Sequence, residues 1–132
     1  MAALRRRAKE LHASARREIL KDQDSGALLL FYAAECALKA TYMHRNNLKN
    51  TADARGSAVA ARTFLHNLMY LVQSLNIPRA SLKQAPPRVL SRSGLAIDVP
   101  SLHQAWRYGE KVDDTTLICE WLISIIKWCE IN

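Results

Sequence analysis

The sequence predicts an all-α protein, folded as an antiparallel bundle of four to five helices. Apolar residues recur with a period near 3.6 in most of the chain, and no segment alternates apolar and polar residues as a strand does. Only four glycines and four prolines are present, too few for the many tight turns of an all-β fold. The 132 residues, 49% of them hydrophobic, suffice for one core, so we expect a single domain over residues 1–132.

Two helices are expected in the first half of the chain. Residues 3–21 predict an amphipathic helix whose apolar stripe is surrounded by a broad basic face. Residues 26–48 predict a helix that is apolar nearly all round in its first part, so we expect it at the centre of the bundle. Asp24 or Ser25 is expected to cap this second helix, because their side-chain oxygens can accept bonds from its free backbone N–H groups.

A third helix is expected over residues 57–75 and should end before Pro78, because proline restricts the residue that precedes it. Its expected buried face consists of Val59, Thr63, His66, Leu68, Tyr70, Leu71 and Leu75. A short helix is expected around residues 80–84, and another, opened by Pro100, over residues 101–111.

The last helix is expected over residues 114–131, with Asp113 or Asp114 as its N-cap. It is apolar on more than one face, so it is either part of the core or one half of a subunit interface. If it docks on another chain, the expected anchors are Trp121, Ile125 and Trp128, since tryptophan is favoured at interface hot spots.

The cysteines and the apolar stretches indicate a reducing compartment and no membrane span. Cys36, Cys119 and Cys129 are odd in number and form no CxxC pair, which is typical of reduced, buried thiols. The N-terminus lacks the apolar region of a signal peptide. The longest apolar stretch, residues 27–36, is far short of the roughly 20 residues that cross a bilayer. We therefore expect a cytoplasmic protein without membrane association.

The net charge of +7 is unevenly distributed. The first 21 residues hold seven basic and two acidic residues, no acidic residue lies between Asp53 and Asp98, and the tail beyond is acidic. Such a basic surface attracts polyanions. The expected nucleic-acid-binding residues are Arg5, Arg6, Arg7, Arg88 and Arg92. A solvated basic surface and an acidic protein partner are the alternatives.

The sequence carries none of the common phosphate-loop, dinucleotide, zinc-protease or nucleophile-elbow motifs. No histidine has a histidine or cysteine three or four positions away, so we expect neither a metal nor a cofactor. A metal-independent RNase needs a base for the 2′-hydroxyl proton and a cation for the phosphorane. Arg62 and His66, four apart on the expected third helix, are the candidate catalytic pair. A structural role for His66 is the alternative, and Arg7 with His12 is a looser pair.

Three short segments resemble motifs of the HEPN-domain family and occur in that family's order. Residues 33–40 (AAECALKA) resemble its A-A-E-x-A-L-K-A stretch, residues 66–71 (HNLMYL) its H-[DN]-L-x-x-L segment, and residues 106–108 (WRY) its R-Y. The resemblance implies an all-α bundle, commonly dimeric. Family members act as RNases in toxin–antitoxin, CRISPR and abortive-infection systems, or bind RNA or nucleotides without catalysis, and many pair with a nucleotidyltransferase.

The residues that carry the resemblance, Glu35, Lys39, Arg107 and Tyr108, are further site candidates. Glu35 and Lys39 lie on an otherwise apolar helix, where a partly buried charge needs a partner. We therefore predict that Glu35 or Lys39 meets Arg107, His66 or Tyr108 across the bundle.

The first hypothesis for function is a HEPN-like module that binds RNA or a nucleotide, as a homodimer, in prokaryotic defence or a toxin–antitoxin system. The alternatives are a metal-independent RNase toxin and a small assembly subunit that docks on a protein such as an antitoxin or a nucleotidyltransferase. The family's nuclease signature is R-x(4–6)-H late in the domain, and no histidine follows Arg107, so the binding module comes first.

Overall fold

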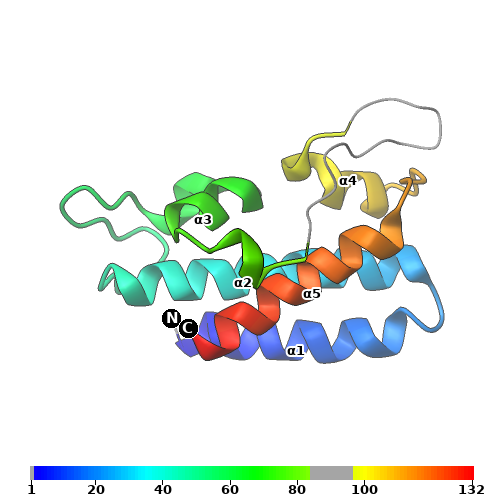
Figure 1. The fold of residues 1–132 in the computed structure, drawn as a ribbon, viewed down its shortest axis with the longest axis horizontal. Coiled ribbons are helices and arrows are strands. Elements are labelled where there is room, and N and C mark those ends of the chain that lie inside the picture. Colours follow the sequence, from blue (N-terminus) through cyan, green and yellow to red (C-terminus); the bar gives the residue numbers. More distant parts are fainter. Residues whose placement is uncertain (1, 84–96) are drawn as a thin grey trace.

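The computed structural model describes residues 2–83 and 97–132, and these residues form helices and turns without a β-strand (Figure 1). The α-helices are α1 (Ala2–Glu18), α2 (Gln23–Arg45), α3 (Leu68–Ser74), α4 (Leu102–Arg107) and α5 (Thr115–Ile131). Three single turns of 3₁₀-helix are η1 (Ala61–Phe64), η2 (Arg79–Ser81) and η3 (Val99–Ser101). The all-α prediction is confirmed for this part of the chain, with three long helices and two short ones.

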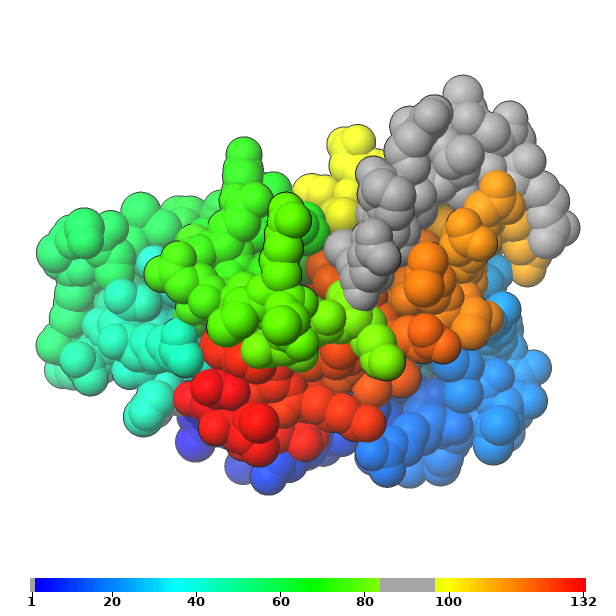
Figure 2. Space-filling view, viewed as in Figure 1, coloured from blue at the N-terminus to red at the C-terminus, as the bar shows by residue number. Residues whose placement is uncertain are grey.

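The central helix is α2, which packs against α1, α3, α4 and α5. Its buried residues lie on most of its circumference, as the apolar sequence predicted. The chain ends of α1 and α5 lie at the same end of the molecule (Figure 1). In the space-filling view, α5 lies between α1 on one side and α3 with η2 on the other (Figure 2). No helix in the described ranges is long and apolar enough to cross a membrane.

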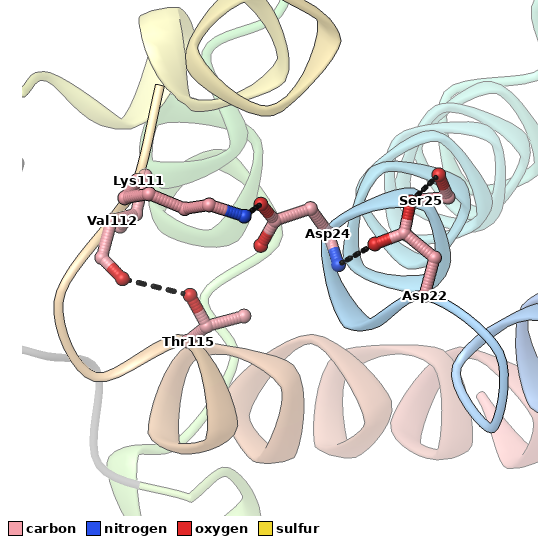
Figure 3. Close-up of polar contacts among 6 residues, drawn as sticks. All are labelled: Asp22, Asp24, Ser25, Lys111, Val112 and Thr115. Atoms are coloured by element: carbon pink, nitrogen blue, oxygen red, sulfur yellow. Dashed lines mark hydrogen bonds and ion pairs between the residues drawn. The ribbon is translucent and has the colours of Figure 1, made fainter. Parts of the chain in front are cut away.

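The cap of α2 is Asp22, so the prediction of Asp24 or Ser25 is wrong (Figure 3). Asp22 accepts hydrogen bonds from the backbone N–H of Asp24 (3.1 Å) and from the hydroxyl of Ser25 (2.7 Å). The helix therefore begins at Gln23, three residues earlier than expected. The Asp24 carboxylate instead pairs with the Lys111 ammonium at 2.9 Å, which ties the start of α2 to the segment that leads into α5.

The last helix is confirmed within one residue, and Asp114 is its N-cap residue as predicted, although the cap lacks the expected side-chain hydrogen bond. Asp114 occupies the cap position with a φ of +56°, and its side chain makes no capping hydrogen bond. Thr115 instead donates its hydroxyl proton to the carbonyl of Val112 at 3.0 Å (Figure 3). The helix belongs to the core rather than to an exposed face: Trp121 and Trp128 are both buried. The anchors expected for a docking partner, Trp121, Ile125 and Trp128, are therefore covered by the chain itself.

The helix expected over residues 57–75 is wrong, because a tight turn divides this range. Leu65 adopts a φ of +50°, and the Asn67 N–H donates to the Phe64 carbonyl at 2.9 Å. The Asn67 side chain then accepts from the Tyr70 N–H at 3.3 Å and caps α3. Asparagine favours such caps over helix interiors, which explains why η1 and α3 are separate.

The expected buried face of this range is right for three leucines and wrong for three other positions, and His66 is half-buried. Leu68, Leu71 and Leu75 are buried as predicted. Val59, Thr63 and Tyr70 are exposed, because the side chains no longer follow one helical stripe.

The two short helices are shorter than predicted. In the described part of the segment expected over residues 80–84, which excludes residue 84, only the single turn η2 is present. The helix expected over 101–111 is η3 followed by α4. Gly109, with a φ of +79°, lies just beyond the end of α4. This is a conformation that glycine adopts readily, and it ends the helix at Arg107, two residues before Gly109.

Gly26 in the first turn of α2 gives a test of the packing between α1 and α2. A Cβ at this position would lie 2.7 Å from the Cα of Ile19 and 2.8 Å from its backbone nitrogen. In an open helix Gly→Ala gains about 1 kcal/mol. Here we expect Gly26→Ala to destabilise the protein by about 1–3 kcal/mol, since backbone must move to admit the methyl group. Urea unfolding would measure this, and an equally or more stable variant would refute the close approach.

Candidate functional site

A cluster of ionisable side chains lies where α2 meets the turn before α3 and the helix α4. It consists of Glu35 and Lys39 from α2, His66 from the turn and His103 from α4, and we call it the histidine–carboxylate cluster. The His66 Nδ1 lies 2.7 Å from Glu35 Oε2, and the Lys39 Nζ lies 3.6 Å from Glu35 Oε1. The prediction that Glu35 or Lys39 meets Arg107, His66 or Tyr108 across the bundle is confirmed by the contact between Glu35 and His66.

The two charges on α2 are mostly buried, whereas His66 is open to solvent. The side chains of Glu35 and Lys39 are 12% and 14% exposed, and that of His66 is 43% exposed. Burying a charge is costly unless it is paired and hydrogen-bonded. Glu35 meets this condition because its carboxylate pairs with both His66 and Lys39, which holds it in place under the His66 ring.

The His66 ring lies on a second imidazole. The ring centroids of His66 and His103 are 4.0 Å apart, and His103 stacks on Phe31 at 5.5 Å. Tyr32 lies beside both imidazoles, 6.5 Å from His66 and 6.0 Å from His103. The cluster therefore has a hydrophobic, aromatic floor and one imidazole at its mouth.

His103 is buried, and its pKa is lowered below the ordinary histidine value of 6.5. Burial is the main cause, because it disfavours the charged imidazolium, and the neighbouring His66 acts in the same direction. The Glu35 carboxylate acts in the opposite direction and is outweighed. His103 is therefore a neutral imidazole at neutral pH.

The backbone before His66 is strained. Leu65 has a φ of +50°, a conformation that favours glycine, and its side chain is 69% exposed. Neither the backbone conformation nor burial of the side chain therefore explains why a leucine occupies this position. A non-glycine residue in such a conformation costs on the order of 1–3 kcal/mol and persists only where the surroundings hold it. Strain of this kind is concentrated at functional sites, and here it sets the position of His66.

The contacts of His66 decide which of its atoms can react. With the Glu35 carboxylate accepting a hydrogen bond from Nδ1–H, the Nε2 atom is left to accept a proton or to bind a ligand. A carboxylate that orients an imidazole in this way is the arrangement used in general acid–base catalysis.

The remaining motif residues lie outside the cluster. Arg107 and Tyr108 are exposed at the end of α4, and the Arg107 guanidinium lies 5.9 Å from the centroid of the Tyr108 ring. The charge of Arg107 adds a minor part to the lowered pKa of His103, after burial and His66. Arg107 therefore faces the same region without joining the contacts around Glu35.

The candidate pair Arg62 and His66 does not share a helical face, so the geometric basis of that prediction is wrong. Arg62 is exposed on η1, and the Leu65 turn separates it from His66. Within residues 2–83 and 97–132, neither a hydrogen bond nor a short ring contact joins the two side chains. Their catalytic role stays a prediction.

The expected nucleic-acid-binding arginines lie on α1 or outside the described residues. Arg6 and Arg7 are exposed and lie 4.0 Å and 3.3 Å from Glu10, and Arg5 is half-buried. Arg88 and Arg92 fall in the range 84–96, for which the structure gives no description.

His103 is the cluster residue that sequence reasoning missed. It lies 37 positions after His66, and this spacing carries no metal or catalytic signature. The one usable signal was its place on the same short helix as the Trp106–Tyr108 motif, one turn before it. In the described part of the chain, no group of three or more His, Cys, Asp or Glu side chains is arranged to hold a metal ion.

Comparison with protein-family models, with curated protein sequences and with solved structures finds no match to this chain.

The lowered pKa of His103 predicts how stability depends on pH. Below about pH 6.5 the unfolded chain takes up a proton that the buried imidazole refuses, so the free energy of unfolding falls as the pH falls. We expect this fall, measured by urea unfolding between about pH 7.5 and 5.5, to be smaller in His103→Gln. The exposed His44→Gln is the matched control and should keep the wild-type dependence. Equal slopes in His103→Gln and the wild type would show that His103 is not buried as a neutral ring.

Proposed function

We propose that this chain is a HEPN-like helical module that binds RNA or a nucleotide, in prokaryotic defence or a toxin–antitoxin system. The observation that carries the proposal is the half-exposed His66, held at 2.7 Å by the nearly buried Glu35. A buried carboxylate that orients one solvent-facing imidazole is better explained by a ligand site than by stability alone.

The chemistry around His66 suits a phosphorylated, aromatic ligand. The Nε2 atom of His66 can hydrogen-bond a phosphate or a base edge, and an imidazole face can stack on a nucleobase. Arg107 is an exposed guanidinium on the adjoining helix, and such groups bind phosphate in a bidentate manner. Together these groups can contact a base and its phosphate.

The basic face of α1 supports a polyanionic ligand. Arg6 and Arg7 are exposed, and one carboxylate, Glu10, lies between them. A local excess of positive charge raises the rate of encounter with RNA and supplies contacts to phosphates that do not depend on sequence.

A homodimer, or docking on a partner such as an antitoxin or a nucleotidyltransferase, belongs to the same proposal. Several large apolar side chains are exposed outside the core: Val59, Leu65, Tyr70 and Tyr108. Aromatic residues on a surface are enriched at interfaces. These residues replace the buried tryptophans as the candidate contacts.

A second candidate function is a metal-independent RNase, and the Glu35–His66 contact favours it. His66 Nε2 would take the proton of the RNA 2′-hydroxyl, whose oxygen then attacks the phosphorus to form a 2′,3′-cyclic phosphate, and the departing 5′-oxygen would take a proton from water. Glu35 would stabilise the imidazolium that forms, and a cation would stabilise the phosphorane. In this mechanism Arg107, which lies one turn after His103 on α4, is a candidate cation beside Arg62.

Binding of a short single-stranded RNA, followed by fluorescence anisotropy, tests the proposal. We expect the affinity to fall with added salt, and each of Arg6→Gln and Arg107→Gln to weaken binding several-fold and to reduce the salt slope by about 0.7 per lost phosphate contact. Lys49→Gln, an exposed cation in the loop after α2, is the control of equal charge change. Equal loss in Lys49→Gln would indicate attraction by net charge alone, and undetectable binding at low salt would refute the proposal. Cleavage of the RNA by the wild type that is lost in a folded His66→Ala variant would establish the RNase instead.

A further inference from the structure

A pocket lies between α1, α2 and α5, and none of the residues that line it belongs to the histidine–carboxylate cluster. It has a volume of about 220 Å³ and is formed between α1 and α5, which both pack on α2. Three groups that can carry positive charge line it: His12 and Arg16 from α1 and Lys127 from α5. Its apolar wall includes Ile19, Leu30 and Ile123.

His12 is the nearly buried member of this set, with 7% of its surface exposed. Its pKa is lowered from 6.5, first because burial disfavours the imidazolium and next because of the charge of Arg16. Lys127 adds to the lowering, and Glu130 on α5 opposes it. Near His12, the single carboxylate of Glu130 is therefore outnumbered by the positive charges of Arg16 and Lys127. His12 itself can become a third positive charge.

Arg16 and Lys127 are exposed at the rim of the pocket. In the described ranges their side chains form no ion pair, unlike Arg6, Arg7 and Lys111, which each meet a carboxylate. Like charges placed together over a low-dielectric wall repel one another. An anion in the pocket would remove this repulsion and would also favour protonation of His12.

We propose that this pocket binds a tetrahedral oxoanion with two negative charges, such as phosphate or the phosphoryl group of a small phosphomonoester. The Arg16 guanidinium and the Lys127 ammonium donate hydrogen bonds to its oxygens from two helices, and the protonated imidazole of His12 supplies a third donor. The apolar wall leaves room for a short carbon chain. The site uses no residue of the histidine–carboxylate cluster, so it stands or falls independently of the proposed function.

The ionisation of His12, followed by NMR of the histidine side chains in the full chain, tests the site. The assignment comes from the spectrum of His12→Gln. Sulfate is the first probe because it keeps its double charge over the pH range in which histidine titrates, and sodium chloride of equal ionic strength is the reference. We expect saturating sulfate to raise the pKa of His12 by about one unit or more, since an anion within contact distance favours the imidazolium. Inorganic phosphate and glycerol phosphate are the second and third probes.

Three variants separate a built site from general attraction. Arg16→Gln and Lys127→Gln should each raise the pKa of His12 without any anion, because they remove a repelling charge, and should each weaken sulfate binding at least several-fold. Arg17→Gln, an exposed arginine of α1 whose side chain contacts Ser14, is the matched control and should behave as the wild type. Stronger binding of glycerol phosphate than of phosphate would support the phosphomonoester, and equal binding the free oxoanion. An unchanged His12 pKa in sulfate, or equal losses in Arg17→Gln and Lys127→Gln, would overturn the proposal.

Discussion

The helix α2 is buried on most of its circumference, and the positions of the other helices follow from that burial. Phe31, Leu30 and Leu38 are among its fully buried side chains, and each contributes about 1.5–3 kcal/mol when removed from water. Because α2 cannot expose an apolar face on any side, α1, α3, α4 and α5 must all pack on it. The small side chains of α2, such as Ala33, Ala34 and Ala37, let these neighbours approach closely. The molecule is thus built around one helix rather than around a ring of equivalent ones.

This burial makes the charged residues of α2 informative. Glu35 and Lys39 lie on a helix that offers them almost no water, so they need partners from within the fold. The Glu35 carboxylate is paired with Lys39 from the same helix and with His66 from the turn before α3. The strained Leu65 backbone is the local cost of bringing His66 to that place. The defined position of the imidazole also satisfies the requirement of the core that Glu35 be paired, and this explains how a small bundle can hold a precise polar arrangement.

The sequence predicted those parts of the fold and the site that depend on local patterns. The helices α1, α2 and α5 follow from the apolar pattern of the sequence, and the rule that a buried charge is paired predicted that Glu35 or Lys39 has a partner among three candidates, of which His66 is the one found. The prediction of one helix over residues 57–75 was wrong because the helical period of apolar residues continues through Leu65 in the sequence. The backbone turns at Leu65, and Asn67 caps a new helix. His103 was missed because its value lies in a contact with His66 that no spacing encodes. The Asp22 cap was missed because three candidate capping residues lie within four positions.

The interaction between Glu35 and His66 is the contact on which the account of the site depends, and a double-mutant cycle measures it most directly. The free energies of unfolding of the wild type, Glu35→Gln, His66→Ala and the double variant give the coupling between the two side chains. A hydrogen bond to a nearly buried carboxylate predicts a coupling of about 1 kcal/mol or more. The pair Glu35→Gln and Tyr70→Ala, which involves an exposed side chain of α3, should be additive. Additivity within about 0.3 kcal/mol for Glu35 and His66 as well would mean that the carboxylate does not hold the imidazole, and would contradict the account.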